Sequence, residues 1–204
     1  MKIAALPVFL IWTLSVFSQE SPNVKYGKIT ASDLAKKSYE ADTGASAVVL
    51  YEIGNTKIKG NSKGWFSLEF TTHRRIHILN KNGFDQATVE IPLYTAGEDE
   101  EKLDELKAVT YNLENGKVSE SKLDKNSLFK EKKNKNLIIQ KFTMPGVKEG
   151  SVIEYEYKIT SDFLFNLQPW AFQGTIPRLW SEYKLALPQF LNYILIAQGN
   201  LPYY

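Results

Sequence analysis

Apolar and polar residues alternate along most of this chain. The clearest case is residues 151–159, where the odd positions carry large apolar side chains: Ile153, Tyr155, Tyr157 and Ile159. The even positions of the same run carry charges: Glu154, Glu156 and Lys158. A period of two is typical of a half-buried β-strand. Residues 145–150, with one proline and two glycines, predict the turn that introduces it.

The same period predicts further strands at residues 47–53, 65–79, 89–93, 109–113, 138–144 and 183–187. Asn115-Gly116 predicts a tight hairpin that returns through Val118. Residues 30–39 form the one predicted helix, because Thr30 and Asp33 resemble a capping arrangement. Roughly nine strands with one short N-terminal helix and no βαβ alternation predict a mainly β protein, an antiparallel β-sandwich over residues 30–204.

Arg74 interrupts the apolar side of the predicted strand 65–79. Two explanations fit: a bulge shifts the register there, or the guanidinium reaches across the sheet to a carboxylate. The acidic segment 98–105 is also irregular, and one helical turn is an option for it. As a run of like charges, it is predicted to be a solvated face.

The first eighteen residues differ from the rest. Lys2 precedes an uncharged apolar run, residues 3–17, and small residues at 16 and 18 suit a signal peptidase. We predict a signal peptide at 1–18 and an extended leader at 19–29, with an uncleaved anchor helix as the alternative. The run is short for a bilayer, which needs about 20 residues. Export to the periplasm or the medium, without stable membrane insertion after cleavage, is therefore expected.

Composition narrows the choice of partners. Of 25 basic residues Lys2 leaves with the signal, so 24 basic and 23 acidic residues give the mature chain a charge of +1. That balance predicts no nucleic-acid partner. The sequence contains no cysteine, which excludes a disulfide framework and a thiolate nucleophile.

The candidate catalytic and metal-binding motifs lack the neighbouring structure that their chemistry needs. Gly60 to Gly64 matches G-x-S-x-G around Ser62, but a predicted strand follows the serine where a nucleophile elbow needs a helix. His73 and His77 stand about 13 Å apart along one strand, too far for one metal ion, and are predicted to be ordinary exposed or edge residues. We predict no metal and no cofactor.

An aromatic cluster follows the strand 151–159, namely Trp170, Phe172, Trp180 and Tyr183. Core packing is the common use of such residues. The alternative is a surface platform on which a glycan or peptide ligand stacks. These four residues are the candidate ligand-binding site.

Several motifs in this region resemble one family. They are Gly150-Ser151-Val152-Ile153-Glu154-Tyr155, Trp170-x-Phe172-Gln173, Ile176-Pro177, Ser181-Glu182-Tyr183 and Leu187-Pro188. Together with residues 42–50 and 75–83, they are similar to the uncharacterised domain that precedes transglutaminase-like domains in exported proteins of Gram-negative bacteria. The resemblance covers residue 29 to the C-terminus and implies a β-sandwich.

What the resemblance implies about function is limited. The papain-like domain of such proteins would carry a Cys-His-Asp triad, and this chain has no cysteine. We therefore expect a non-catalytic accessory or binding module, with a transglutaminase-like domain or protein as partner and a C-terminally truncated fragment as an option. Two alternatives stay open: an interaction protein that uses an open edge strand near the C-terminus, and a serine hydrolase that uses Ser62.

Overall fold

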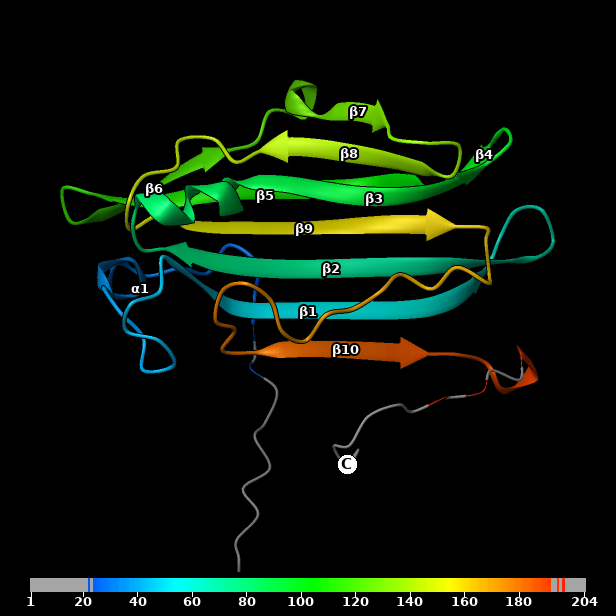
Figure 1. Cartoon of the computed structure of the whole chain (residues 1–204), viewed down its shortest axis with the longest axis horizontal. Helices are drawn as coiled ribbons and strands as arrows, with labels where there is room; N and C mark the ends of the chain where they lie inside the picture. Colours follow the sequence, from blue (N-terminus) through cyan, green and yellow to red (C-terminus); the bar gives the residue numbers. More distant parts are fainter. Residues whose placement is uncertain (1–21, 23, 192–193, 195, 197–204) are drawn as a thin grey trace, which may run out of the picture.

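A computed structural model describes residues 22, 24–191, 194 and 196, and it contains ten strands. The strands form two sheets that lie face to face (Figure 1). The larger sheet has the order β10 (Ser181–Ala186), β1 (Ala47–Gly60), β2 (Phe66–Ile78), β9 (Val152–Ser161), β5 (Lys102–Glu114) and β6 (Lys117–Lys122). The smaller sheet has the order β4 (Asp99–Glu100), β3 (Thr88–Ala96), β8 (Leu137–Thr143) and β7 (Phe129–Lys132).

Short helical segments complete the described part. Helix α1 (Ala31–Ala35) begins at Thr30 with the predicted capping box. Three 3-10 helices follow, η1 (Lys81–Ala87), η2 (Lys125–Ser127) and η3 (Gln189–Leu191). The predicted antiparallel β-sandwich with one short N-terminal helix is confirmed. One strand pair differs, because β10 runs parallel to β1 after the chain has crossed the sheet.

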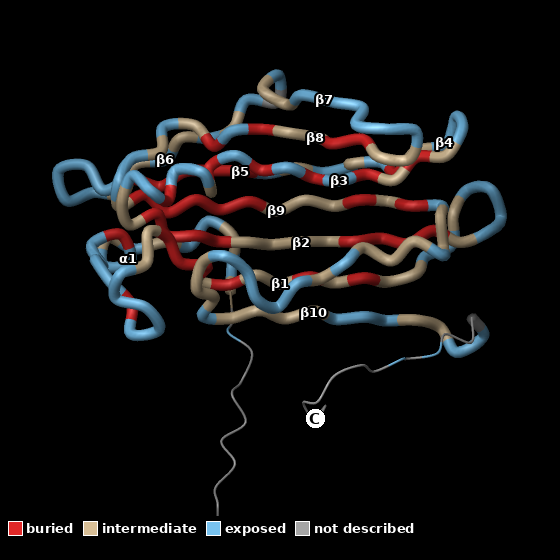
Figure 2. Tube along the Cα trace, viewed as in Figure 1, coloured by how far each residue is buried: buried red, intermediate tan, exposed pale blue. Residues whose placement is uncertain are grey.

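The main core lies between the sheets. Alternate residues of β2, β9 and β3 point into it, including Phe70, Ile153 and Ile91. Figure 2 shows buried positions recurring along the central strands of both sheets. The period of two read from the sequence therefore identifies the face that packs inward.

The opposite face of the larger sheet is also covered in part. Leu34 of α1 packs with Val109, Tyr111 and Val152, and Tyr26 borders this second cluster. The N-terminal segment and α1 thus cover side chains that a two-layer sandwich would leave in water. This cover has consequences for the polar residues beneath it.

Arg74 follows the second of its two predicted explanations. Its Nε atom lies 3.6 Å from Oε1 of Glu52 on β1. A register shift does occur next to Arg74, between Val49 and Tyr51 of β1, but β2 itself pairs with β9 through Arg74 without a shift. The guanidinium therefore stays on the inner face because it forms an ion pair with a carboxylate on the neighbouring strand.

The acidic segment 98–105 is not helical. Residues 99–100 form β4, and the chain then changes sheets at Glu101 to begin β5. Glu101 is fully buried, which corrects the prediction of a solvated face at this position. Its carboxylate accepts hydrogen bonds from the backbone N–H of Tyr94 (2.8 Å) and the side-chain amides of Asn166 (3.0 Å) and Gln168 (2.8 Å).

The predicted signal peptide at 1–18 lies outside the described residues, as do residues 19–21 and 23 of the predicted leader. Among the residues that the structure describes, no helix is long and apolar enough to span a membrane.

Candidate functional site

The segment 162–180 connects β9 to β10 and passes over the inner face of β1 (Figure 1). It carries Trp170, whose ring stacks on Tyr183 of β10 with 5.2 Å between centroids and 26° between planes. The indole N–H of Trp170 donates to Oγ of Ser181 at 3.2 Å. Two of the four predicted binding residues are therefore in direct contact.

Gly54 of β1 makes this position of Trp170 available. A Cβ atom at Gly54 would lie 2.4 Å from the indole ring and 2.7 Å from the ring of Tyr183. Such distances are well inside van der Waals contact, so only glycine lets both rings lie on the strand. The sequence offers no pattern that would have assigned this role to Gly54.

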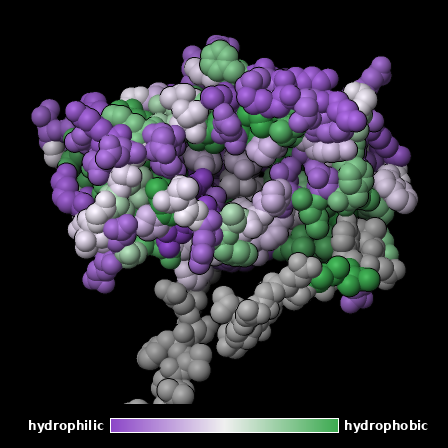
Figure 3. Space-filling view, viewed as in Figure 1, coloured by the Kyte–Doolittle hydropathy of each residue, from purple (hydrophilic) through white to green (hydrophobic). Residues whose placement is uncertain are grey.

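A cleft of about 220 Å³ opens beside Trp170, between β3 and the crossing segment. The surface is hollowed near the middle of the face drawn in Figure 3. Aromatic rings line the cleft: Phe70, Tyr157, Trp170 and Tyr183. Polar side chains line it as well: Glu52, Thr56, Thr71, Thr72, Gln168 and Arg178. We call this feature the Trp170 cleft.

Charges at one wall of the Trp170 cleft are paired. Arg178 contacts the carboxylate of Glu52, which Arg74 also approaches. The Nε atoms of both arginines are buried and have no hydrogen-bond partner in the described part of the chain. At the opposite wall the hydroxyls of Thr56 and Tyr183 lie 2.6 Å apart. The cleft therefore combines flat apolar rings with hydrogen-bonding groups, the usual make-up of a small binding site.

The other two predicted binding residues do not line the cleft. Phe172 is 57% exposed on the crossing segment. Trp180 is half-buried, and its indole N–H donates to Oε2 of Glu182 at 3.0 Å. The four aromatic residues close in sequence thus divide into a pair at the cleft and two separate residues.

A second polar cluster, which the sequence did not reveal, lies on the outer face of the larger sheet. Its centre is Glu154, whose side chain is completely buried. Oε1 of Glu154 accepts hydrogen bonds from Tyr51 at 2.5 Å, His73 at 2.7 Å and Arg75 at 2.8 Å. Oε2 accepts from the backbone N–H of Gly27 at 3.0 Å and the hydroxyl of Tyr111 at 3.1 Å.

These contacts set the electrostatics of the Glu154 cluster. Burial alone would raise the pKa of Glu154, but the hydrogen bonds from His73 and Tyr51 and the charge of Arg75 outweigh it and lower the pKa to about 2. Burial and the neighbouring carboxylate raise the pKa values of Tyr51 and Tyr111. Glu154 is therefore ionised and the phenols are neutral donors at neutral pH.

The arrangement resembles an acid–base pair in outline only. A carboxylate fixes the imidazole of His73, as in hydrolase triads. No serine or threonine hydroxyl of the described residues bonds to His73, and the ring of Tyr26 covers it with 5.7 Å between centroids. The cluster joins the N-terminal segment to β1, β2, β5 and β9, which is a structural task.

Both histidines were predicted to be exposed or edge residues, and this was wrong. β2 is a central strand, so both side chains are enclosed. His77 is completely buried, and its Nδ1 lies 2.9 Å from the hydroxyl of Tyr39. Burial lowers the pKa of His77 to about 4, and it is neutral at pH 7. The prediction was wrong because the N-terminal segment covers both histidines, and the alternation of residues within β2 holds no information about that cover.

Ser62 lies in the exposed turn between β1 and β2, with a strand on each side. It therefore lacks the strand-to-helix setting of a nucleophile elbow. Within the described ranges no group of three or more His, Asp or Glu side chains is placed to hold a metal ion.

The fold and the cleft define the class of protein first. It is a mainly β sandwich with a small aromatic cleft under a crossing segment. Residues 66–195 match the family model DUF3857, described as a domain of unknown function with a solved structure. The match covers more than half of the chain, so the chain belongs to this family.

Solved structures provide one further comparison, and 21 of their chains match. Among them is a crystal structure described as "a putative protease" from Parabacteroides distasonis ATCC 8503. Its TM-score is 0.51 at 13% sequence identity, over 71% of this chain and 29% of that chain. The likeness concerns the fold alone, and the chain spans under a third of that protein's length. A search of curated proteins found no match.

Proposed function

We propose that this chain is an exported, non-catalytic binding module that receives a peptide or glycan chain in the Trp170 cleft. In this proposal it presents that chain to a transglutaminase-like domain or protein. Export rests on the pattern of residues 1–18, and the partner rests on the family motifs around residues 150–188. The lack of any cysteine supports a non-catalytic role beside a thiol enzyme.

The stacked pair of Trp170 and Tyr183 is the observation that carries the proposal. Their rings are held in place by Gly54, Ser181 and Thr56, so a ligand would meet a preorganised aromatic surface. Preorganisation reduces the entropy cost of binding. Arg178 lines the cleft and can donate to a backbone carbonyl or a sugar hydroxyl, whereas the side-chain amide of Gln168 already donates to Glu101.

The structural neighbour resembles this chain in fold alone. It is described as a putative protease, and this chain aligns with 29% of its length. A module of this size would be one part of a larger protein, with any catalytic residues elsewhere.

Calorimetry with a panel of glycans and peptides tests the proposal on the mature protein. A ligand should bind wild type and bind Trp170→Ala about fivefold more weakly, since a lost stack is worth on the order of 1 kcal/mol. The matched control is Trp65→Ala, because Trp65 is 61% exposed and does not line the cleft. Melting temperatures of both variants confirm folding. Equal loss in both variants, or no binding across the panel, would reject the cleft as the binding site.

A second candidate function uses the last strand. β10 is an edge strand that pairs with β1 alone among the described strands. A partner could extend the sheet there by strand addition. Hydrogen exchange of residues 181–186 with and without a transglutaminase-like partner tests it, and unchanged exchange would exclude it.

A further inference from the structure

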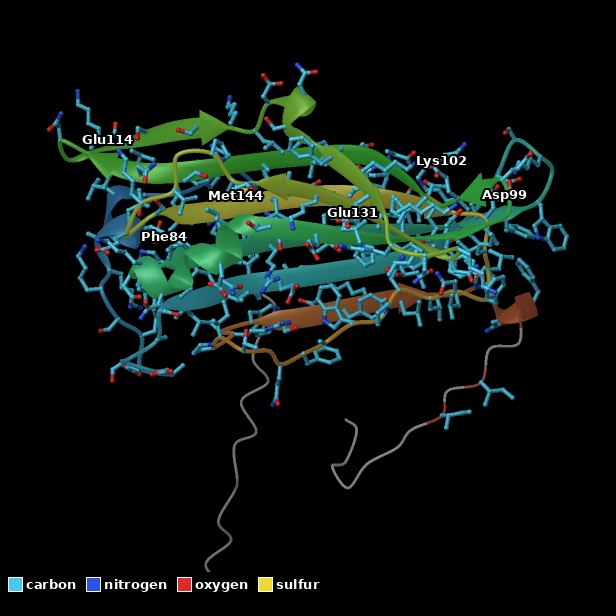
Figure 4. The ribbon with its side chains drawn as sticks, turned by 45° about the horizontal axis from the view of Figure 1, so that its top comes forward. Phe84, Asp99, Lys102, Glu114, Glu131 and Met144 are labelled. Atoms are coloured by element: carbon cyan, nitrogen blue, oxygen red, sulfur yellow. The ribbon has the colours of Figure 1, made fainter. Side chains whose placement is uncertain are left out.

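Strand β5 is longer than its outer neighbour. β9 accompanies it from Lys102 to Tyr111, whereas β6 pairs with it only from Val109 to Glu114. On the β6 side of β5, the backbone hydrogen bond nearest to the Lys102 end runs from the N–H of Leu123 to the carbonyl of Ala108 at 2.9 Å. Figure 4 labels the two ends of β5, and β6 lies beside the Glu114 end and stops before the Lys102 end.

Residues 102–107 therefore form a sheet edge inside a longer strand. Within the described part of the chain they pair with β9 alone. The register with β9 shifts once, between Leu103 and Glu105, and is regular from Glu105 onward. An unpaired edge presents a row of backbone donors and acceptors. At about 3.3 Å per residue this row is roughly 20 Å long.

A groove of about 800 Å³ runs along this edge. Its inner wall is apolar, with the half-buried side chains of Leu103, Leu106, Leu123 and Leu128. Its outer rim includes Lys107 and Lys122, both exposed. Three carboxylates also line the rim and are engaged: Glu105 pairs with Lys158, Asp104 accepts from Thr160, and Glu120 lies 3.9 Å from Lys122.

We propose that this groove binds an extended peptide, which adds to β5 as an antiparallel strand in line with β6. An extended backbone is the ligand whose donors and acceptors repeat with the spacing of a sheet edge. Side chains on one side of such a strand would enter the leucine wall. Those on the other side would lie beside Lys107 and Lys122, which favour carboxylates. The predicted ligand class is therefore a peptide that alternates apolar and acidic residues.

This site is separate from the Trp170 cleft, and no residue lines both. Binding at one can be lost while binding at the other persists. The inference thus stands independently of the proposed function.

The test uses wild-type mature protein and a blocked peptide about eight residues long that alternates valine with glutamate. Two further peptides carry N-methyl groups at alternate residues, in one or the other register. One register removes the N–H groups that face β5, and the other leaves them intact. We expect affinity to fall at least about tenfold in one register only, because each lost backbone bond costs about 1 kcal/mol. Amide exchange of residues 102–107 should slow with the unmodified peptide.

Two protein variants locate the site. Leu106→Lys should abolish binding because it places a charge in the apolar wall, and Lys107→Glu should weaken binding to the acidic peptide while leaving the fold unchanged. Equal effects of both N-methyl registers, protection at 181–186 alone, or no binding at millimolar peptide would overturn the proposal. It would also be overturned if sedimentation showed a dimer of this chain that excludes the peptide, because the occupant would then be a second copy.

Discussion

The backbone N–H of Gly27 donates to the carboxylate of Glu154 across 127 residues of sequence, at 3.0 Å. This bond fixes the N-terminal segment on the outer face of the larger sheet. The carboxylate that receives it sits on β9, in the strand that carries the strongest period-two pattern of the chain. A residue predicted to face water is thus the point where five segments meet.

Replacing Glu154 should destabilise the whole domain. Glu154→Gln removes the charge that neutralises Arg75 and leaves buried donors unpaired, so we expect a loss of about 3 kcal/mol in the free energy of unfolding by urea. Glu156→Gln, two residues along the same face and only half-buried, should change stability by less than about 0.5 kcal/mol. An equal loss in the free energy of unfolding for the two variants would contradict a stabilising role of the Glu154 cluster.

Stability should fall with acid in two overlapping steps. His77 has a folded pKa of about 4, below its ordinary value of 6.5, so the unfolded state binds the proton first and stability declines as pH falls from about 6.5 to 4. Glu154 has a folded pKa of about 2 against 4.5, so its contribution is complete above 4.5 and is lost between about 4.5 and 2.

Urea unfolding at a series of pH values measures both steps. Each step should amount to on the order of 3 kcal/mol, given the two pKa shifts. An NMR titration checks the step at higher pH directly. A His77 imidazole that titrates near 6.5 in the folded protein would contradict the lowered pKa of His77.

Gly54→Ala should disturb the Trp170 cleft. The new methyl group would overlap the indole ring, which must then leave Tyr183. We expect a loss of about 1–3 kcal/mol in stability and a change in tryptophan fluorescence. Gly60→Ala, in the same strand, is the control, because the nearest atom to its Cβ is 3.9 Å away. If Gly54→Ala is as stable as this control, the close packing of Trp170 and Tyr183 on Gly54 is contradicted.

Glu101→Gln should loosen the crossing segment. Glu101 holds the side-chain amides of Asn166 and Gln168, and an amide oxygen with one NH₂ group cannot accept all three of its hydrogen bonds. We expect a loss of about 1–3 kcal/mol and faster amide exchange in residues 163–170. Glu100→Gln, an adjacent residue with a partly exposed side chain, should leave exchange in that segment unchanged.

Most of the fold could be predicted from periodicity. The strand predicted at 65–79 is observed at Phe66–Ile78, and the hairpin at Asn115-Gly116 has positive φ at both residues. Local chemistry decides such features, since side chains alternate within a strand and asparagine and glycine accept left-handed backbone. Of the four aromatic residues predicted to bind a ligand, Trp170 and Tyr183 meet at a cleft, while Phe172 and Trp180 do not line it; ligand binding there stays a prediction.

The sequence by itself determined most of the long strands, their inward faces, the mainly β class and the family motifs, because each is encoded within a few consecutive residues. Only the tertiary structure decided the fate of the polar residues. Glu154 and His77 within their strands, and Glu101 between β4 and β5, look solvated from the local sequence. They are buried because segments distant in sequence cover them and supply partners. Burial of a charge depends on such partners, and a period of two carries no information about them.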